Sequence, residues 1–377
     1  MDLAGDGLTP VRVLVVNAGS SSLKLRLLDE HDAVLHTADI PAGAEGFNAE
    51  RLEAVLQDWG EPDVVAHRVV HGGTSFTGAV RIDDAVRREL EELTDLAPLH
   101  QPKSLAALDA VTGRLPDVVA VACFDTGFHT SIPTAAATYP VPKQWRERYG
   151  VRRYGFHGLS HAYASRHAGV LLDRPVEGLR MVICHLGAGA SLTAVVDGRS
   201  VDTTMGFTPL EGVVMATRSG TVDPGLVLWL VEHAQLTPRE VADALVHHSG
   251  LTALAGTGDM REVEEAARSG DPDAVLALDV HTHRLAGGVA AMAAAAAGLD
   301  VLVFTGGVGE NSAKVRQLAA DRLGFLGVGV DPRRNADVAG DADVTAPGAT
   351  VRTLVVAARE EIQMARETRD LLSGRPC

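Results

Sequence analysis

The pattern of hydrophobic and polar positions near the start of the chain predicts a β-hairpin with a polar tip. Four apolar residues, 13–16, lead into the Gly- and Ser-rich segment 17–22, and leucines then alternate with basic residues over 23–27. Alternation of this kind is typical of a half-buried strand, so the pattern indicates strand, tight turn, strand. A dinucleotide fingerprint and a Walker loop both need a helix after the glycines, and both therefore fit poorly.

The same pattern occurs a second time. Adding 168 to each number lays residues 13–29 on 181–197 without a gap, and Gly19 then matches Gly187. Backbone N–H groups and hydroxyls at such a tip suit a polyphosphate, and Asn17 can orient a hydrated metal. Two such hairpins half a chain apart predict a duplicated fold whose halves face each other across a cleft.

The remaining periodicity alternates strands with helices in both halves, which is typical of an α/β protein. Further strands are expected at 33–40, 64–70, 118–124, 201–204, 301–305 and 351–356. Helices are expected at 49–59, 82–96, 102–115, 226–233, 238–248, 263–298, 314–323 and 360–372.

Composition narrows the class of protein. A chain of 377 residues with 46% hydrophobic residues is long enough for two cores. The net charge of −15, without any basic block, disfavours a nucleic-acid partner. The most apolar stretch, 286–304, is rich in Ala and Gly and broken by Asp300, which indicates a buried helix followed by a strand rather than a membrane span.

The N-terminus shows no secretory signal, so a cytoplasmic protein is expected. Cys123 and Cys184 sit in apolar runs, and with Cys377 they make an odd set without a C-x-x-C pair, so disulfides and structural zinc are not expected.

Several residues outside the hairpins are candidates for chemistry. Gly306-Gly-Val-Gly309 follows a predicted strand and precedes a helix, which suits close approach of a nucleoside. Arg68 and Arg218 follow apolar runs and precede glycines, and the arginine fork suits a carboxylate or a phosphoryl group. Asp125 follows the strand at 118–124, where a functional carboxylate or a simple turn cap would lie.

His157 and His161 stand four residues apart, a spacing that some metal sites use. No carboxylate or cysteine of ligand spacing accompanies them. His157 better suits a donor aimed at developing negative charge, and a core histidine satisfied by hydrogen bonds is the alternative.

Seven motifs together resemble the acetate kinases. They are 17–24 (NAGSSSLK), 67–73 (HRVVHGG), 124–129 (FDTGFH), 154–158 (YGFHG), 205–212 (MGFTPLEG), 217–220 (TRSG) and 304–311 (FTGGVGEN). The matches keep their order from residue 13 to about 366. The resemblance implies a duplicated actin-like (ribonuclease H-like) α/β fold whose two domains flank a nucleotide cleft. The domains would be 1–148, completed by a C-terminal helix of about 362–377, and 149–361.

The activity implied by the resemblance is Mg²⁺-dependent, reversible phosphoryl transfer from ATP to acetate in a cytoplasmic homodimer, with Mn²⁺ as a substitute metal. Arg68, Arg218 and His157 would hold acetate and the migrating phosphoryl group. Asp125 would position an arginine or the magnesium shell rather than remove a proton, because acetate is already ionised at neutral pH.

The resemblance also implies the binding residues. Asn17 and Glu360 would lie near the metal. The acetate pocket would consist of Arg68, Val70, Leu99, His100, Phe156 and Pro209. The phosphates would meet Ser20, Ser22, Lys24, His185, Leu186, Gly187, Ala188 and Gly189. The nucleoside would meet Asp259, Met260, Arg261, Gly306, Gly307, Val308, Gly309 and Glu310.

Three departures from the family pattern bear on these roles. Ala188 stands where the family has asparagine, which removes a side-chain donor near the phosphates and leaves the preferred phosphoryl donor open. Ala358-Arg359 replaces Thr-Asn before Glu360, so Glu361 is an alternative metal residue. The stretch 252–258 is altered as well, which bears on nucleoside specificity.

Two other functions are carried as alternatives. A kinase for propionate or another short-chain acid is the nearest, because one methylene in an apolar pocket changes selectivity by only about 1–3 kcal/mol. A non-catalytic nucleotide-dependent switch is the other, although it would have no use for the arginine, aspartate and histidine set.

Overall fold

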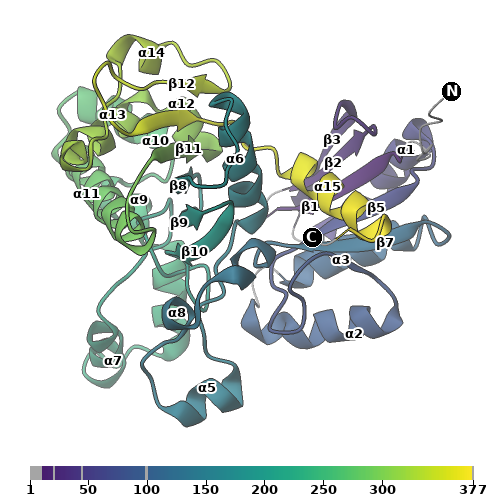
Figure 1. Cartoon of the computed structure of the whole chain (residues 1–377). Helices are drawn as coiled ribbons and strands as arrows, with labels where there is room; N and C mark the ends of the chain where they lie inside the picture. The colour runs from purple at the N-terminus through teal and green to yellow at the C-terminus, as the bar shows by residue number, and fades with distance from the viewer. Residues whose placement is uncertain (1–10, 20–21, 44–45, 98–100, 376–377) are drawn as a thin grey trace, which may run out of the picture. The chain divides into compact units, whose positions relative to one another are not determined.

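The computed structural model describes residues 11–19, 22–43, 46–97 and 101–375. Its contacts divide the chain into two compact units, Met1–Gly127 with Arg359–Cys377, and Phe128–Ala358 (Figure 1). The division falls at 127/128 rather than at the expected 148/149, and at 358/359 rather than 361/362. His129 ties the intervening segment to the second unit, because its ring nitrogens lie 2.9 Å from both Ser200 Oγ and the Phe156 carbonyl.

The first unit contains a seven-stranded sheet with the strand order β4-β3-β2-β1-β5-β7-β6. Its strands are β1 (Val13–Ala18), β2 (Ser22–Leu28), β3 (Val34–Gly43), β4 (Gly46–Phe47), β5 (Val64–Val69), β6 (Val80–Arg81) and β7 (Val119–Phe124). Its helices are α1 (Ala49–Trp59), α2 (Asp84–Glu92), a 3-10 turn (Leu93–Leu96), α3 (Gln101–Thr112) and α15 (Glu360–Leu372). Strands β1, β5 and β7 are parallel neighbours, whereas β2, β3 and β6 pair antiparallel.

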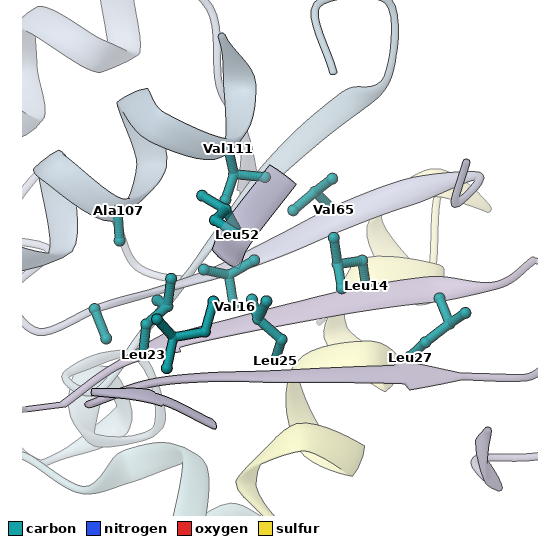
Figure 2. Close-up of a cluster of buried hydrophobic side chains, with 11 residues drawn as sticks. Leu14, Val16, Leu23, Leu25, Leu27, Leu52, Val65, Ala107 and Val111 are labelled. Atoms are coloured by element: carbon teal, nitrogen blue, oxygen red, sulfur yellow. The ribbon is translucent and has the colours of Figure 1, made fainter. Parts of the chain in front are cut away.

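Alternate residues of these strands build the core of the first unit. Side chains from β1 and β2, including Leu14, Val16 and Leu23, pack with Leu52 of α1 and Val111 of α3 (Figure 2). Because successive strand residues point to opposite faces, the other face is left for α15, which packs on β1, β5 and β7. Each of these core side chains is fully buried, which stabilises the fold by about 1.5–3 kcal/mol per large aliphatic side chain.

The second unit repeats this topology in a six-stranded sheet with the order β10-β9-β8-β11-β13-β12. Its strands are β8 (Arg180–Leu186), β9 (Ala190–Val196), β10 (Arg199–Thr203), β11 (Val301–Thr305), β12 (Ala342–Asp343) and β13 (Arg352–Val355). Its longer helices are α5 (Lys143–Tyr149), α6 (Gly158–Leu171), α7 (Pro224–Glu232), α8 (Pro238–His247), α10 (Met260–Arg268), α11 (Pro272–Ala295) and α13 (Ala313–Arg322). The short ones are α4 (Thr134–Ala137), α9 (Gly250–Ala255), α12 (Gly306–Asn311) and α14 (Pro332–Ala336), with 3-10 turns at Gly127–Ser131 and Gly324–Leu326.

The predicted pair of hairpins is confirmed. Strands β1 and β2 form one, β8 and β9 form the other, and in each unit the first strand of the hairpin also pairs in parallel with the next strand of the sheet. The registers differ by one residue, because Ala18 pairs with Leu23 across a four-residue turn while Leu186 pairs with Ala190 across a three-residue turn.

Two predicted elements need correction, and one long helix was not predicted. The helical region 263–298 is two helices, because Gly270 with φ 89° ends α10 and Asp271 caps α11 before Pro272. The glycines at 306–309 do precede a helix, α13 (Ala313–Arg322), close to the predicted 314–323, but they also form the first turns of an additional short helix, α12, which starts at Gly306 with φ 77°. Helix α6 was not predicted at all. In the part of the chain that the structure describes, no helix is both long enough and apolar enough to span a bilayer.

Candidate functional site

The first unit gathers four of the predicted residues at one edge of its sheet. Asn17, Arg68 and Asp125 lie at the carboxyl ends of β1, β5 and β7, which are parallel neighbours and therefore end on the same side. Glu360 is the first residue of α15, the helix that packs on these three strands. The sheet topology thus brings together residues that are up to 343 positions apart in sequence.

Hydrogen bonds connect these four side chains in a row. Arg68 donates to both carboxylate oxygens of Asp125, from Nε at 2.9 Å and from Nη2 at 2.6 Å. Its Nη1 donates to Asn17 Oδ1 at 3.1 Å, and Asn17 Nδ2 donates to Glu360 Oε2 at 3.1 Å. Asp125 therefore orients the Arg68 guanidinium through both of its carboxylate oxygens. This contact differs from the alternative prediction, in which Asp125 would only cap a turn.

Electrostatics at this edge favour a charged Arg68. Burial alone would lower the pKa of Arg68, but the negative charges of Asp125 and Glu360 outweigh burial and raise it. Burial raises the pKa of the Asp125 carboxyl, and the adjacent guanidinium opposes that effect. Burial, with Glu360 next to it, also raises the pKa of Glu361. Asn17 contacts Glu360, so Glu360 is the better placed of the two glutamates.

The first hairpin tip is only partly described. The Gly19 amide donates to the Ser22 carbonyl at 2.9 Å. Ser22 is half-buried and Lys24 is exposed, while Val70 is buried. Three predicted site residues, Ser20, Leu99 and His100, lie outside the described residues, as does Cys377.

In the second unit the side chains of Arg218 and His157 both lie close to Gly189. A Cβ added to Gly189 would lie 2.7 Å from Arg218 Nη2 and 3.2 Å from His157 Nε2. The Nη1 group of Arg218 donates to the Pro209 carbonyl at 2.6 Å. No carboxylate among the described residues pairs with Arg218, and burial lowers the pKa of its guanidinium. A half-buried cation without a carboxylate partner is an attractive place for an anion.

His157 is held firmly in this position. It precedes α6 with a left-handed backbone, φ 57° and ψ 23°, which is uncommon for a residue with a side chain. Its ring stacks on the His185 ring with centroids 4.3 Å apart, and Ser160 Oγ lies 2.8 Å from His185 Nδ1. His157 and His161 both contact the Ser191 hydroxyl. The described residues hold no group of three or more His, Cys, Asp or Glu that suits a metal ion.

A cavity of about 740 Å³ lies beside the second hairpin. Eight predicted residues line it: Leu186, Gly187, Ala188, Asp259, Met260, Arg261, Gly307 and Val308. Gly306, Gly309 and Glu310 do not line it but support its wall. Gly306 lies so close to Leu186 that a Cβ would be 2.8 Å from the Leu186 carbonyl oxygen, and Glu310 accepts from the Ala358 amide at 3.0 Å.

Sequence reasoning did not name several residues of this wall, nor one residue behind it. His281 of α11 and Asn311 of α12 line the cavity. Arg316 of α13 is fully buried and donates to the carbonyls of Gly309 and Glu310 at 2.8 and 2.7 Å, so it anchors the glycine turn. Burial lowers the pKa of Arg316 to about 10. Asn311 ends the motif 304–311, whereas His281 lies in an apolar helix and Arg316 follows the glycine turn, and neither of these two has a signal of its own in the sequence.

Comparison with known proteins agrees with this geometry. The model of the acetokinase family matches residues 36–366. An acetate kinase from a Nostoc species is 45% identical over 404 residues, covering 96% of this chain and all of the relative. The solved acetate kinase of Porphyromonas gingivalis superposes with a TM-score of 0.87 at 34% identity, covering 96% of this chain and 100% of that one.

A solved propionate kinase from Francisella tularensis is as similar in structure. Its TM-score is 0.88 at 34% identity, and the match covers 95% of this chain and 98% of the other. The duplicated actin-like fold is therefore confirmed. With a family match across most of its length and relatives of this identity, the chain belongs to the acetokinase family.

Proposed function

We propose that the protein is an acetate kinase, which transfers the γ-phosphoryl group of ATP to a carboxylate oxygen of acetate and releases acetyl phosphate and ADP. Membership of the acetokinase family supports phosphoryl transfer to a carboxylate. The observation that carries the proposal is the pair of donors above Gly189, Arg218 Nη2 and His157 Nε2, with no carboxylate partner for Arg218 among the described residues.

The reaction makes modest demands on the protein. An oxygen of acetate attacks the γ-phosphorus while the bond from that phosphorus to the ADP oxygen breaks, so no proton has to be removed from the acid. Catalysis then consists of alignment and neutralisation of the charge on the equatorial oxygens. In this proposal Arg218 and His157 donate to those oxygens.

Arg68 is proposed to bind the carboxylate of acetate. Its guanidinium keeps a fixed orientation because Asp125 holds two of its nitrogens and Asn17 holds the third. By the family resemblance alone, Val70, Phe156 and Pro209 are proposed as apolar contacts for the methyl group.

Magnesium is the proposed metal. Mg²⁺ usually takes one or two carboxylates, several waters and the substrate phosphates, and a Glu360 carboxylate oriented by Asn17 fits the protein's share of that set. When bound, the ion would neutralise phosphate charge. Asn17 is proposed to orient Glu360 rather than to ligate the metal directly, because both ends of its amide already have protein partners.

The 740 Å³ cavity is proposed as the nucleoside site of ATP. Its size suits a drug-sized ligand, and Gly187 and Ala188 of the second hairpin turn line it. Ala188 contributes its backbone there, since its carbonyl accepts from the Ala216 amide at 3.2 Å.

A homodimer is also proposed, as the family resemblance implies. Helix α7 supports it, because Leu226, Leu228 and Trp229 expose 45%, 61% and 53% of their surface and no residue of the helix is buried. Such an exposed apolar helix is typical of a surface that another protein covers.

Hydroxamate trapping tests the function. The purified protein is assayed with MgATP, hydroxylamine and acetate, propionate or butyrate, and then with GTP or pyrophosphate as donor. We expect acetate and ATP to give the highest kcat/KM. A higher value with propionate would favour the second candidate, which the Francisella structure supports, and no activity with any acid would refute a kinase of short-chain acids.

Two variants make the assay specific to the site. Arg218→Ala should lower kcat by at least 100-fold, comparable to the loss of one transition-state donor. Arg333→Ala is the matched control, since Arg333 is an exposed arginine of the same unit and its side chain makes no hydrogen bond within the described structure. Equal activity of both variants would contradict the proposed role of Arg218.

A further inference from the structure

Ser191 lies between two histidines in the interior of the second unit. Its Oγ is 2.9 Å from His157 Nδ1 and 2.7 Å from His161 Nε2, and Ser191 is fully buried. The histidines come from the start of α6, one turn apart, and the serine comes from β9. A single hydroxyl therefore joins the two rings without access to solvent.

The Ser191 hydroxyl has one proton to donate, so only two arrangements of the protons on the hydroxyl and the two histidine rings satisfy both hydrogen bonds. If Ser191 donates to His157 Nδ1, then His161 Nε2 carries a proton and donates to Ser191, and His161 Nδ1 is bare. If Ser191 donates to His161 instead, the protons of both rings move to the opposite nitrogens. His161 Nδ1 would then be a buried N–H group.

The surroundings of His161 decide between the two arrangements. Its Nδ1 is buried and meets no hydrogen-bond partner among the described residues. Buried N–H groups without an acceptor are rarer in proteins than under-satisfied acceptors. Burial, together with His129 and His185, lowers the pKa of His161 well below its ordinary value, so the ring is neutral and has only one proton. The first arrangement is the one that leaves no orphaned donor.

The consequence falls on His157. In the first arrangement its Nδ1 accepts from Ser191, and its ring proton is on Nε2. That nitrogen is the one that converges with Arg218 Nη2 above Gly189. The stacked His185 ring keeps the plane of His157 fixed.

We infer that Ser191, backed by His161, is a positioning residue that fixes His157 in the tautomer with its proton on Nε2, so that this nitrogen donates to an anionic oxygen. The inference rests on the proposed function only for the identity of that oxygen. The tautomer itself is a property of the unliganded protein.

Nitrogen-15 NMR of histidine-labelled protein tests the tautomer directly, with His157→Gln used to assign the signals. We expect a protonated Nε2 and an unprotonated Nδ1 at His157 in the wild-type protein. A proton on Nδ1, or a doubly protonated ring at pH 7.5, would overturn the inference. This measurement needs no activity and no variant of Ser191, so it decides the question even if the kinase assay fails.

Kinetics then test whether the tautomer matters. Ser191→Ala should mix the two tautomers and lower kcat about 10–100-fold, the usual cost of losing a group that orients a site residue, with KM for ATP changed less than threefold. Ser191→Thr, which keeps the hydroxyl, should recover most of the loss. Thr193→Val is the matched control, because Thr193 is fully buried on the same strand and its hydroxyl bonds, among the residues that the structure describes, to Thr203 alone.

Two results would contradict the positioning role. One is a Ser191→Ala protein with wild-type kcat and an unchanged His157 tautomer. The other is an equal loss in Thr193→Val, which would attribute the effect to the strand rather than to the histidine. A wild-type protein inactive on all acids, with the expected tautomer, would refute the proposed function and leave the assignment of Ser191 intact.

Discussion

The replacement of Gly189 by alanine should separate anion binding from folding. The added methyl group would lie 2.7 Å from Arg218 Nη2 and 3.2 Å from both Cε1 and Nε2 of His157. Ordinary van der Waals contact begins at 3.4 Å. The end of the Arg218 side chain must therefore move by about 0.7 Å, and the histidine ring by about 0.2 Å.

The magnitudes follow from which atoms have to move. Arg218 Nη2 is the far end of a flexible side chain, so its displacement should cost less than about 1 kcal/mol of folding stability, as at most sites without a buried clash. A misplacement of about 1 Å in a catalytic group can cost on the order of 100-fold in rate, or about 2.7 kcal/mol of transition-state stabilisation. The methyl group also occupies the point on which both donors converge.

The assay compares kcat and KM for acetyl phosphate formation with the thermal unfolding midpoint. Gly287→Ala is the control, because Gly287 lies in α11 and an added Cβ there would have no neighbour within 4 Å. That variant should keep wild-type kcat and gain up to about 1 kcal/mol from helix propensity. Wild-type turnover in Gly189→Ala, or a loss of stability that accounts for the lost activity, would refute the reasoning.

Three further predictions follow from burial and charge. Arg68→Met should lower the free energy of unfolding in urea by about 3–5 kcal/mol, because it leaves the Asp125 carboxylate buried without a partner. The double variant Arg68→Met with Asp125→Leu should recover stability but not activity. A double variant as unstable as the single one would contradict the explanation by the broken ion pair. The free energy of unfolding should be fully present above pH 6.5 and should fall between pH 6.5 and 4, because burial lowers the pKa of His71, His129 and His281 to about 4 while the same histidines in the unfolded chain bind protons near pH 6.5. Each histidine should lower that free energy by about 1.4 kcal/mol per pH unit in this range. A urea midpoint that stays flat between pH 7.5 and 5.5 would contradict this. Trp229→Arg should convert the proposed dimer to a monomer in sedimentation velocity, with exposed Arg333→Ala as control, and an unchanged sedimentation coefficient would exclude α7 from the interface.

The elements with strong local signals could be predicted from the sequence. Helix α1 has the predicted bounds because Asn48 caps it, its side chain accepting from the Arg51 amide, and Gly60 ends it with φ 72°. Strand β11 and helix α15 also begin and end where the pattern of apolar residues predicts. For α1 the capping chemistry and the periodicity indicate the same boundary, whereas for β11 and α15 the periodicity alone indicates it.

Helix α6 shows where this reasoning stops. Most of its residues are buried, from Gly158 to Ser165 without interruption, so it has no polar face and no helical period that a sequence pattern could reveal. Strands β6 and β12 have two residues each and are too short to carry a pattern. Residues such as Arg316 depend on which carbonyls the fold places nearby, and that information is not local.

The two hairpins show why a gapless repeat can still mislead. Residue 17 corresponds to residue 185 in the repeat. Each of these two side chains bonds to a helix that lies on the equivalent face of its own sheet: Asn17 bonds to Glu360 of α15, and His185 bonds to Ser160 of α6. The gapless match aligns Ser191 with Leu23, which packs in the core with α1 and α3.

The second turn is one residue shorter, so Ser191 pairs with His185 instead. A shift of one residue moves a side chain to the other face of a strand. The shorter turn therefore puts Ser191 on the face that α6 covers, within reach of His157 and His161. One scaffold, duplicated, thus supports a carboxylate and amide row in the first unit and a histidine and serine row in the second.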